Sequence, residues 1–312
     1  MTPARPQRTR TYTSPVYDSR RWDGFKPRGG DIVVCTPAKG GTTWTQMLCA
    51  LLVHQSPDLP LPLNRLTRWL DRPAEPIEAV LADLERQTYR RIVKTHTPLD
   101  GLPYFEEVSY VFCGRDPRDI YLSQVDHMSN ISLETLKEEA ARAGTDEIFV
   151  MPGDPNEFFP KWLTTGEQPW MDDGFELGSV LYLSRSYWTF RQLPNFFFLH
   201  YADLSMRLDE EMRRLSAFLG VAVNERRWPS LREAASFDAM RARADETAPG
   251  AHVNEWRSNR DFFRAARLGQ WRTGLSARSL ALYEAVAAQR LDDALRRWLE
   301  WGRVDGCDPA HS

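Results

Sequence analysis

The hydrophobic positions of the chain form short apolar runs, each followed by a polar loop and then by a segment with helical spacing. Residues 31–35 are a β-branched run typical of a buried strand, and residues 42–55 carry apolar residues at helical spacing. The strand-then-polar pattern returns at 90–96 and at 108–116. Because strands alternate with helices, the pattern predicts an α/β fold: one domain with a central parallel sheet, flanking helices and right-handed crossovers.

The second half of the chain is less regular. A helix is expected at 120–130, a strand at 195–204 and an amphipathic helix at 209–220. The segment 131–180 contains four prolines and keeps no steady period. We therefore expect the later part of the domain to combine further strand–helix units with an irregular insertion.

The amino-terminal residues 1–21, rich in Arg, Thr and Pro, predict an extended arm, which leaves residues 22–312 as the folded domain. This arm has no apolar stretch of the signal-peptide type. No segment of the chain approaches the roughly 18 apolar residues of a membrane span. We therefore expect a cytoplasmic protein without a membrane span.

Composition and charge narrow the class of protein. The 312 residues are 42% hydrophobic and 27% charged, which is ordinary for a globular protein. The net charge of −3 argues against a nucleic-acid partner, although local basic clusters can still bind a small polyanion. The four cysteines show no CxxC spacing, so they predict buried reduced thiols, and we expect no metal site.

The first predicted strand leads into the loop "TPAKGGTTW", residues 36–44. Gly40 and Gly41 allow backbone N–H groups to approach an anion closely, and Thr42 and Thr43 would open a helix whose N-terminus favours negative charge. Lys39 adds a mobile positive charge on the same side. The loop therefore predicts an anion site, although its lysine precedes the glycines, unlike that of a Walker-type phosphate loop.

Two further strand ends carry candidate chemistry. The motif "KTH" places Lys94 and His96 at the end of the strand at 90–96, and a histidine at a strand end can act as a general base. Arg115 leaves the strand at 108–116, and Ser123 lies eight residues later on the following helix. An arginine fork and a serine hydroxyl can converge on a phosphate. The three strand ends together predict two anion sites with a base between them, as a nucleotide with a 5′-linked chain and a second phosphate would require.

These motifs give the chain a resemblance to the soluble sulfotransferases that use 3′-phosphoadenosine 5′-phosphosulfate (PAPS). The family's 5′-phosphosulfate loop YPKSGTTW is similar to "TPAKGGTTW", its KTH element to "IVKTHTPLDGLP", and its 3′-phosphate element to "CGRDPRDIYLS". The family's "YEDL" appears as "YADL" at 201–204, and "EFFPKWLTTGE" and "GSV…YW" also look like family segments. Within the family, "KTHTPLDGL" and "GRDPRD" most resemble the mycobacterial-type glycolipid sulfotransferases.

The resemblance implies a P-loop nucleotide-kinase-like sulfotransferase fold and a role for each matched residue. His96 would take the proton of an acceptor hydroxyl, while Lys39 and Lys94 would stabilise charge during in-line sulfuryl transfer. The remaining matched residues would bind PAPS or its product, adenosine 3′,5′-bisphosphate. For the 5′-phosphosulfate these are Lys39, Gly40, Gly41, Thr42 and Thr43; for adenine, Trp44 and Tyr201; and for the 3′-phosphate, Arg115, Ser123 and Arg264. Phe237 is a further candidate for binding the nucleotide.

The chain departs from the family in its C-terminal loop. The family sequence resembles FRKGxxGDWK, whereas this chain has "FFRAARLGQWR", which keeps Arg264 but replaces a lysine and a glycine by Ala265 and Ala266. Arg267 is the candidate substitute cation for the 3′-phosphate. We expect residues 255–272 to be mobile without nucleotide and to become ordered when it binds. The family's dimerisation motif is largely absent from this chain, so the sequence leaves the oligomeric state unknown.

The acceptor is less constrained than the donor. A glycolipid or another hydrophobic alcohol is the leading candidate, and a small phenol or steroid is the second. The segment 131–180 is expected to build the acceptor wall from its aromatic residues Phe158, Phe159, Trp162, Trp170 and Phe175. Two alternatives from other classes remain open at this point: a P-loop phosphotransferase, which would place its lysine after the glycines, and a catalytically silent nucleotide-binding protein.

Overall fold

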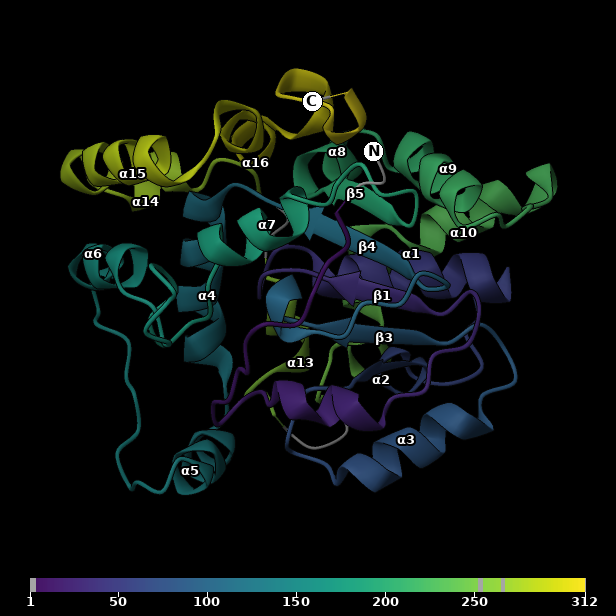
Figure 1. The fold of residues 1–312 in the computed structure, drawn as a ribbon, viewed down its shortest axis with the longest axis horizontal. Coiled ribbons are helices and arrows are strands. Elements are labelled where there is room, and N and C mark those ends of the chain that lie inside the picture. Colours follow the sequence, from purple (N-terminus) through teal and green to yellow (C-terminus); the bar gives the residue numbers. More distant parts are fainter. Residues whose placement is uncertain (1–3, 252–254, 265–266, 312) are drawn as a thin grey trace.

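The computed structural model describes residues 4–251, 255–264 and 267–311. A five-stranded parallel sheet forms its centre, in the order β2-β3-β1-β4-β5. Helices cover both faces of this sheet (Figure 1). The strands are β1 Ile32–Cys35, β2 Thr67–Trp69, β3 Ile92–Thr95, β4 Ser109–Gly114 and β5 Phe196–His200.

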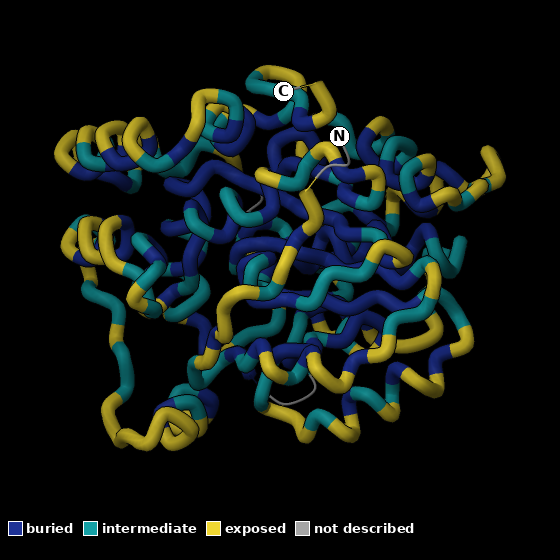
Figure 2. The backbone as a smooth tube through the Cα atoms, viewed as in Figure 1, coloured by how far each residue is buried: buried dark blue, intermediate teal, exposed yellow. Residues whose placement is uncertain are grey.

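The central strands are buried on both faces, so their sequences are almost continuously apolar. In β1 the side chains of Val33 and Cys35 belong to one hydrophobic cluster, and those of Ile32 and Val34 to another. This alternation places one core on each side of the sheet. Figure 2 shows the strands buried and the outer turns of the peripheral helices exposed.

The helices divide between these two cores. Buried residues of α1, α2 and α8 to α12 join the cluster that contains Ile32 and Val34, whereas those of α3, α4, α6, α7, α15 and α16 join the cluster that contains Val33. The longer helices are α1 Thr42–His54, α3 Ile77–Arg86, α4 Pro117–Asn130, α5 Leu133–Arg142, α6 Pro155–Thr164, α7 Leu181–Trp188, α9 Leu208–Phe218, α15 Ala277–Arg290 and α16 Asp293–Asp305. The shorter ones are α2 Leu63–Leu66, α8 Tyr201–Met206, α10 Trp228–Ala234, α11 Phe237–Ala242, α12 Ala244–Thr247, α13 Asn259–Phe262 and α14 Trp271–Gly274, with 3-10 turns at Ser19–Gly24, Leu99–Gly101, Glu225–Arg227 and Pro309–His311.

The observed elements confirm the predicted single α/β domain and correct it in one place. The strand expected at 195–204 ends at His200, and α8 begins at Tyr201. The His200 ring caps this helix, because its Nδ1 atom accepts a hydrogen bond from the Ala202 N–H at 3.2 Å. The apolar run at 195–199 hid this boundary, because it continues into a helix that is also buried.

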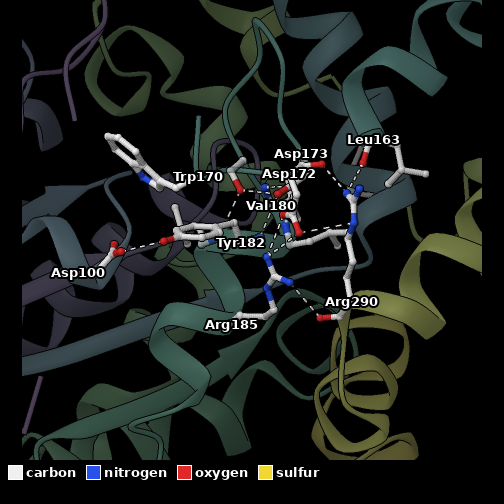
Figure 3. Close-up of polar contacts among 12 residues, drawn as sticks. Asp100, Leu163, Trp170, Asp172, Asp173, Val180, Tyr182, Arg185 and Arg290 are labelled. Carbon is white, nitrogen blue, oxygen red and sulfur yellow. Dashed lines mark hydrogen bonds and ion pairs between the residues drawn. The ribbon is translucent and has the colours of Figure 1, made fainter. Parts of the chain in front are cut away.

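The amino-terminal segment packs against the domain. Tyr12 is fully buried, and its hydroxyl donates to the Asp100 carboxylate at 2.8 Å. Tyr182 donates to the same carboxylate, also at 2.8 Å (Figure 3). Trp170 lies edge-on to Tyr12, with ring centroids 5.8 Å apart. These contacts join the arm predicted at 1–21 to the loop after β3 and to the start of α7.

The loop that follows α6 is fixed by two neighbouring carboxylates. Asp173 is fully buried and accepts hydrogen bonds from the Val180 and Leu181 backbone N–H groups, both at 2.7 Å. Asp172 forms an ion pair with Arg185 at 2.8 Å and another with Arg290 (Figure 3). Within the irregular stretch 131–180, residues 165–180 therefore form a loop that hydrogen bonds and ion pairs hold between α6, α7 and α15.

Two further properties of the described residues concern membrane-spanning helices and cysteines. None of their helices is long and apolar enough to cross a lipid bilayer. All four cysteines are free thiols, and Cys35, Cys49 and Cys113 are buried, as the sequence predicts.

Candidate active site

The strand ends that carry the three sequence motifs lie next to one another. β1, β3 and β4 are neighbours in the sheet, and parallel strands present their carboxyl ends at one edge. A cavity of about 120 Å³ opens there, which we call the nucleotide-side cavity. All but two of the residues that the sequence assigns to nucleotide binding line it: Lys39, Gly41, Thr42, Thr43, Trp44, Arg115, Ser123, Tyr201, Phe237 and Arg264.

Gly40 and Arg267 are the two that do not line this cavity. Gly40 lies behind it in the loop and donates its N–H to the Pro37 carbonyl at 2.9 Å. Arg267 is exposed, and its backbone carbonyl accepts a hydrogen bond from the Arg115 guanidinium at 3.4 Å. Its side chain has no contact with the cavity, so its role as a substitute cation stays a prediction.

The loop between β1 and α1 leaves backbone donors free for an anion. Lys39 and Gly41 have positive φ angles of 68° and 108°. A Cβ atom on Gly41 would lie 3.0 Å from the Cys113 Sγ atom, so the position requires glycine for space as well as for conformation. Gly41 is the N-cap of α1, and within the described residues no side chain caps this helix. The first-turn N–H groups therefore remain available, and the helix dipole favours a negative charge beside them.

The Lys39 ammonium is held between two aromatic rings at the edge of the cavity. Its Nζ atom lies 4.1 Å from the centre of the Phe262 ring and 3.5 Å from the His127 Nδ1 atom. Burial lowers the pKa of Lys39 to about 7, and the positive charge of Arg115 acts in the same direction. An anion placed beside this ammonium would stabilise its protonated form.

The Arg115 guanidinium is a buried cation with unused hydrogen-bonding capacity. It is only 4% exposed, it lies 4.2 Å above the Tyr201 ring, and its Nη1 atom donates to the Lys39 carbonyl at 3.2 Å. Its Nε atom is buried without a hydrogen-bond partner among the described residues. Since buried donors are normally paired, this orphan donor beside a cavity, with Ser123 also in the lining, fits a phosphate group.

Aromatic rings from three helices form another side of the same cavity. The Trp44 Nε1 atom donates to the Ala235 carbonyl at 2.9 Å, which fixes the indole. The Trp44 ring lies edge-on to Tyr201, with centroids 5.4 Å apart, and Phe237 lines the cavity from α11. The cavity thus combines cations, free amides and aromatic rings, a donor set that fits a purine nucleotide with two anionic groups. Stacking of Trp44 on adenine itself remains a prediction.

His96 is oriented with one ring nitrogen free. Its Nδ1–H donates to the Thr36 carbonyl at 2.7 Å, which leaves the Nε2 lone pair for another proton. Burial lowers the pKa of His96 to about 3, and the charge of Lys94 adds to this effect. The ring lies edge-on to Trp69, with centroids 5.0 Å apart. His96 is therefore neutral over the physiological pH range, as a general base must be before it accepts a proton.

Buried hydroxyls hold the end of β3 around this histidine. The side chains of Thr95 and Thr97 both donate to the Asp71 carboxylate, which is fully buried after β2. The Tyr187 hydroxyl donates to the Thr97 carbonyl at 3.0 Å. These bonds fix the backbone on both sides of His96, so its ring orientation follows from the fold.

Lys94 does not line the nucleotide-side cavity. It lines a second cavity of about 260 Å³, which we call the acceptor-side cavity. Its Nζ atom lies 4.4 Å from the centre of the Trp69 ring. Burial lowers the pKa of Lys94 to about 8, and the neighbouring Arg72 acts in the same direction. The two lysines predicted to be catalytic therefore line different cavities.

The aromatic residues expected to form the acceptor wall line neither cavity. Phe158, Phe159 and Trp162 are buried in the core, and Trp170 contacts the amino-terminal segment. Neither cavity therefore supports this expectation, and a role of these aromatic residues in acceptor binding stays a prediction. The segment contributes polar residues instead: Thr135, Glu138 and Arg142 of α5 reach the acceptor-side cavity.

The C-terminal loop is tied to α4 at both of its ends. At its start, Arg257 donates its N–H to the Asn130 carbonyl at 2.7 Å. At its end, the Gly269 and Trp271 N–H groups donate to the Asp119 carboxylate at 2.7 and 3.2 Å. Between these ties, Arg264 is exposed and forms an ion pair with Asp126 of α4. The substituted alanines, Ala265 and Ala266, lie outside the described residues.

Sequence reasoning missed several residues that contact the site. His127 lies one helical turn after Ser123, so the i, i+4 rule could have placed it on the same face. Trp69, Arg72 and Phe262 carry no local signal, because they come from segments far from the motifs. Burial lowers the pKa of His127 well below its usual range, and nearby Lys39 adds to the effect, so this ring is neutral and can accept a hydrogen bond from the lysine.

Comparison with known proteins identifies the family. The sulfotransferase domain family matches residues 29–294. The chain belongs to the sulfotransferase family. Glycolipid sulfotransferases of Mycobacterium bovis and Mycobacterium tuberculosis are both 38% identical to it, and each alignment covers 96% of this chain and 96% of the relative. An amine sulfotransferase of Oryctolagus cuniculus is 23% identical over 93% of this chain and 90% of its own length.

Solved structures share the fold of this sulfotransferase. Mouse sulfotransferase SULT7A1 complexed with PAP superposes with a TM-score of 0.68 at 19% identity, covering 91% of this chain and 94% of that one. Retinol dehydratase in complex with androsterone and the inactive cofactor PAP gives 0.67 at 21% identity, with 88% and 84% covered. Family membership confirms the predicted PAPS-dependent sulfotransferase and overturns the phosphotransferase alternative.

Proposed function

We propose that this sulfotransferase transfers the sulfuryl group of PAPS to a hydroxyl of a glycolipid-type acceptor, with His96 as the general base. The relatives at 38% identity over 96% of the chain carry the name glycolipid sulfotransferase, which supports this acceptor class. The single observation that carries the mechanism is the His96 ring. Its Nδ1–H is committed to the Thr36 carbonyl, its Nε2 atom accepts no hydrogen bond from the described residues, and its ring contacts Trp69 of the acceptor-side cavity.

PAPS supplies an activated sulfuryl group whose departure leaves a phosphate, so negative charge develops on both the transferring and the leaving oxygens. Lys39 and the first-turn amides of α1 neutralise charge on the 5′ side, and Arg115 with Ser123 binds the 3′-phosphate. Lys94 provides a second positive charge from the acceptor side. His96 accepts the proton of the attacking hydroxyl at Nε2, and the Thr36 carbonyl stabilises the resulting imidazolium through Nδ1–H.

The alternative of a silent nucleotide-binding protein makes no use of this arrangement. Binding alone requires neither a neutral, oriented histidine nor two lysines with pKa values lowered to about 7 and about 8. Burial of such groups is costly and is typical of sites that transfer protons or stabilise developing charge.

Incubation with sulfur-35-labelled PAPS and a panel of glycolipid, phenol and steroid acceptors tests the proposal. We expect label on a lipid-linked sugar in the wild-type protein, and labelling slower by about 100-fold or more with His96→Ala. A His96→Ala protein that binds adenosine 3′,5′-bisphosphate normally serves as the folding control. Absence of labelled product from every acceptor, in a protein that binds the nucleotide, would contradict the proposed transfer.

A further inference from the structure

The acceptor-side cavity has an unusual lining for a site that accepts a lipid. Residues from segments 63–75, 135–142 and 247–250 line it, together with Glu255, Thr43, Gln46 and Lys94. Seven of its lining residues are charged and only four are apolar. Typical small-molecule pockets are lined mainly by hydrophobic and aromatic side chains. An alkyl chain or a steroid nucleus would bury these charged groups without replacing their hydrogen bonds to water, which is costly.

The charged side chains of this cavity are held in ion pairs. Arg72 donates to both oxygens of Glu255, at 3.0 and 2.9 Å. Arg68, which is 3% exposed, donates to Glu75 at 2.7 Å. These pairs fix planar groups around the cavity, and such groups present their remaining donors and acceptors in a constant geometry.

The balance of charge distinguishes between neutral and anionic acceptors. The lining contains four cations, namely Arg68, Arg72, Lys94 and Arg142, and three carboxylates, namely Glu75, Glu138 and Glu255. Lys94 is the cation beside Trp69 and His96, where the transferred group arrives. Without Lys94, cations and carboxylates are equal in number. An acidic head group would therefore meet carboxylates as often as cations, whereas a neutral hydroxyl-rich group can both donate to the acids and accept from the arginines.

The size of the cavity limits how much of an acceptor it holds. Its volume of about 260 Å³ is below the range of roughly 300–1,000 Å³ that pockets for drug-sized ligands occupy. Ala74 and Glu75 at its margin are exposed, so the cavity opens to solvent at that point. A sugar head group fits inside, and a lipid tail would extend outward past this margin.

From these observations, and resting on the proposed function, we infer that the acceptor-side cavity binds the head group of a neutral, hydroxyl-rich glycoside, and that the Arg72–Glu255 pair sets its preference for uncharged sugars. The lipid part of the acceptor remains outside the cavity. A phenol, a steroid or an acidic sugar is a poorer occupant.

Probes with one tail and different head groups test this inference. The probes are octyl β-glucoside, dodecyl β-maltoside, octyl β-glucuronide, octanol and 2-naphthol, each below any concentration at which it forms micelles. Binding to protein saturated with adenosine 3′,5′-bisphosphate is measured by calorimetry, and sulfuryl transfer is measured separately with labelled PAPS. We expect at least one neutral glycoside to bind about tenfold or more tightly than octanol, because it adds hydrogen bonds to charged groups.

Two variants locate the binding. Ala74→Trp obstructs the exposed margin of the cavity without removing a polar group, and the exposed Ala79→Trp on α3 is its matched control outside the lining. We expect Ala74→Trp to weaken glycoside binding about tenfold or more while nucleotide affinity is unchanged. Glu255→Gln removes one carboxylate and leaves Arg72 with a spare charge. It should shift the ratio of glucoside to glucuronide affinity about tenfold toward the glucuronide.

The outcomes separate this inference from the proposed function. Octanol or 2-naphthol binding as tightly as every glycoside would overturn the neutral-sugar inference, and so would equal glycoside binding by Ala74→Trp and Ala79→Trp. Unchanged head-group preference in Glu255→Gln would overturn the role of the Arg72–Glu255 pair. Tight glycoside binding without any labelled product supports the inference while contradicting the proposed transfer. Labelled phenol without glycoside binding would overturn both the inference and the glycolipid-type acceptor, while it would support sulfuryl transfer from PAPS.

Discussion

The nucleotide-side cavity and the acceptor-side cavity both contain several cations, but they differ in how those cations are paired. On the nucleotide side, no carboxylate of the described residues lies within ion-pair distance of Lys39 or Arg115. On the acceptor side, Arg68 and Arg72 are paired with Glu75 and Glu255. Buried cations without a partner call for a polyanion, whereas paired cations form a neutral polar wall. The number of basic residues alone would not distinguish the two sites.

Each of the two cavities also contributes one lysine to the proposed site of sulfuryl transfer. Lys39 lines the nucleotide-side cavity and Lys94 the acceptor-side cavity, and burial lowers the pKa of both lysines. A negative charge placed beside either lysine would favour its protonated form. We therefore place the site of sulfuryl transfer where the cavity with unpaired cations meets the cavity with paired cations.

The largest effect is expected from substitution of His96, the proposed general base. His96→Ala removes the proposed acceptor of the hydroxyl proton, so turnover should fall by about 100-fold or more. Affinity for adenosine 3′,5′-bisphosphate should remain, because His96 does not line the nucleotide-side cavity. The measurement is kcat with a fixed acceptor, alongside calorimetry of the nucleotide. Activity above about a tenth of the parent would exclude His96 as the base.

Arg115 tests the unpaired cation on the nucleotide side. Each hydrogen bond to a charged group is worth about 1.5 to 3 kcal/mol, so Arg115→Ala should weaken adenosine 3′,5′-bisphosphate by about tenfold or more. Binding of 5′-AMP, which lacks the 3′-phosphate, should change little. Arg118→Ala is unsuitable as a control because Arg118 is paired with Asp116; the exposed Arg232→Ala on α10 is a better one. Equal wild-type affinity for the two nucleotides would remove the basis for a 3′-phosphate site at Arg115.

The nucleotide side could be predicted from sequence because its groups follow directly after strands. A glycine-rich turn, KTH and Arg115 with Ser123 all sit in short motifs, and the parallel sheet brings the ends of β1, β3 and β4 together. The position of α1 followed from the apolar pattern for the same reason, whereas the short strand β2 at Thr67–Trp69 was not predicted. Local sequence and a simple topological rule were sufficient there.

The acceptor side could not be predicted because no local pattern records it. Arg72 and Glu255 are 183 positions apart in the chain, and only the packed fold joins them. The aromatic residues of 131–180 drew attention by composition, but Phe159 and Trp162 are core residues. The boundary after β5 was missed for a similar reason, since Tyr201 and Leu204 are buried in a helix as they would be in a strand.

The pH dependence of nucleotide binding follows from the lysine on the unpaired side. With a pKa of about 7, Lys39 of the free protein loses its proton as the pH rises through neutrality. A bound anion favours the protonated form, so affinity for adenosine 3′,5′-bisphosphate should fall by about fivefold between pH 7 and pH 8, with proton uptake on binding. Calorimetry in buffers of different ionisation enthalpy measures both quantities. Lys39→Met should flatten the profile, and an equally steep profile in that variant would assign the titration to another group.

The smallest effect is expected at the C-terminal loop, where the nucleotide side is least complete. Hydrogen bonds already hold Arg257 to α4 at one end and Gly269 to Asp119 at the other, so the ordering expected on nucleotide binding should be confined to residues between these ties. Hydrogen exchange with and without adenosine 3′,5′-bisphosphate should show added protection at 259–264 and 267–268 and little change at 255–258. Ordering this stretch costs about 1 to 2 kcal/mol per residue for the backbone, which offsets much of the gain from new contacts. Arg267→Ala should therefore weaken nucleotide binding only about threefold, as for an exposed ion pair.

Protection that is high without nucleotide and unchanged with it would indicate a preformed loop. No change in affinity for Arg267→Ala would then leave Arg264 as the loop's contribution to the 3′-phosphate, reached by exchanging Asp126 for the phosphate.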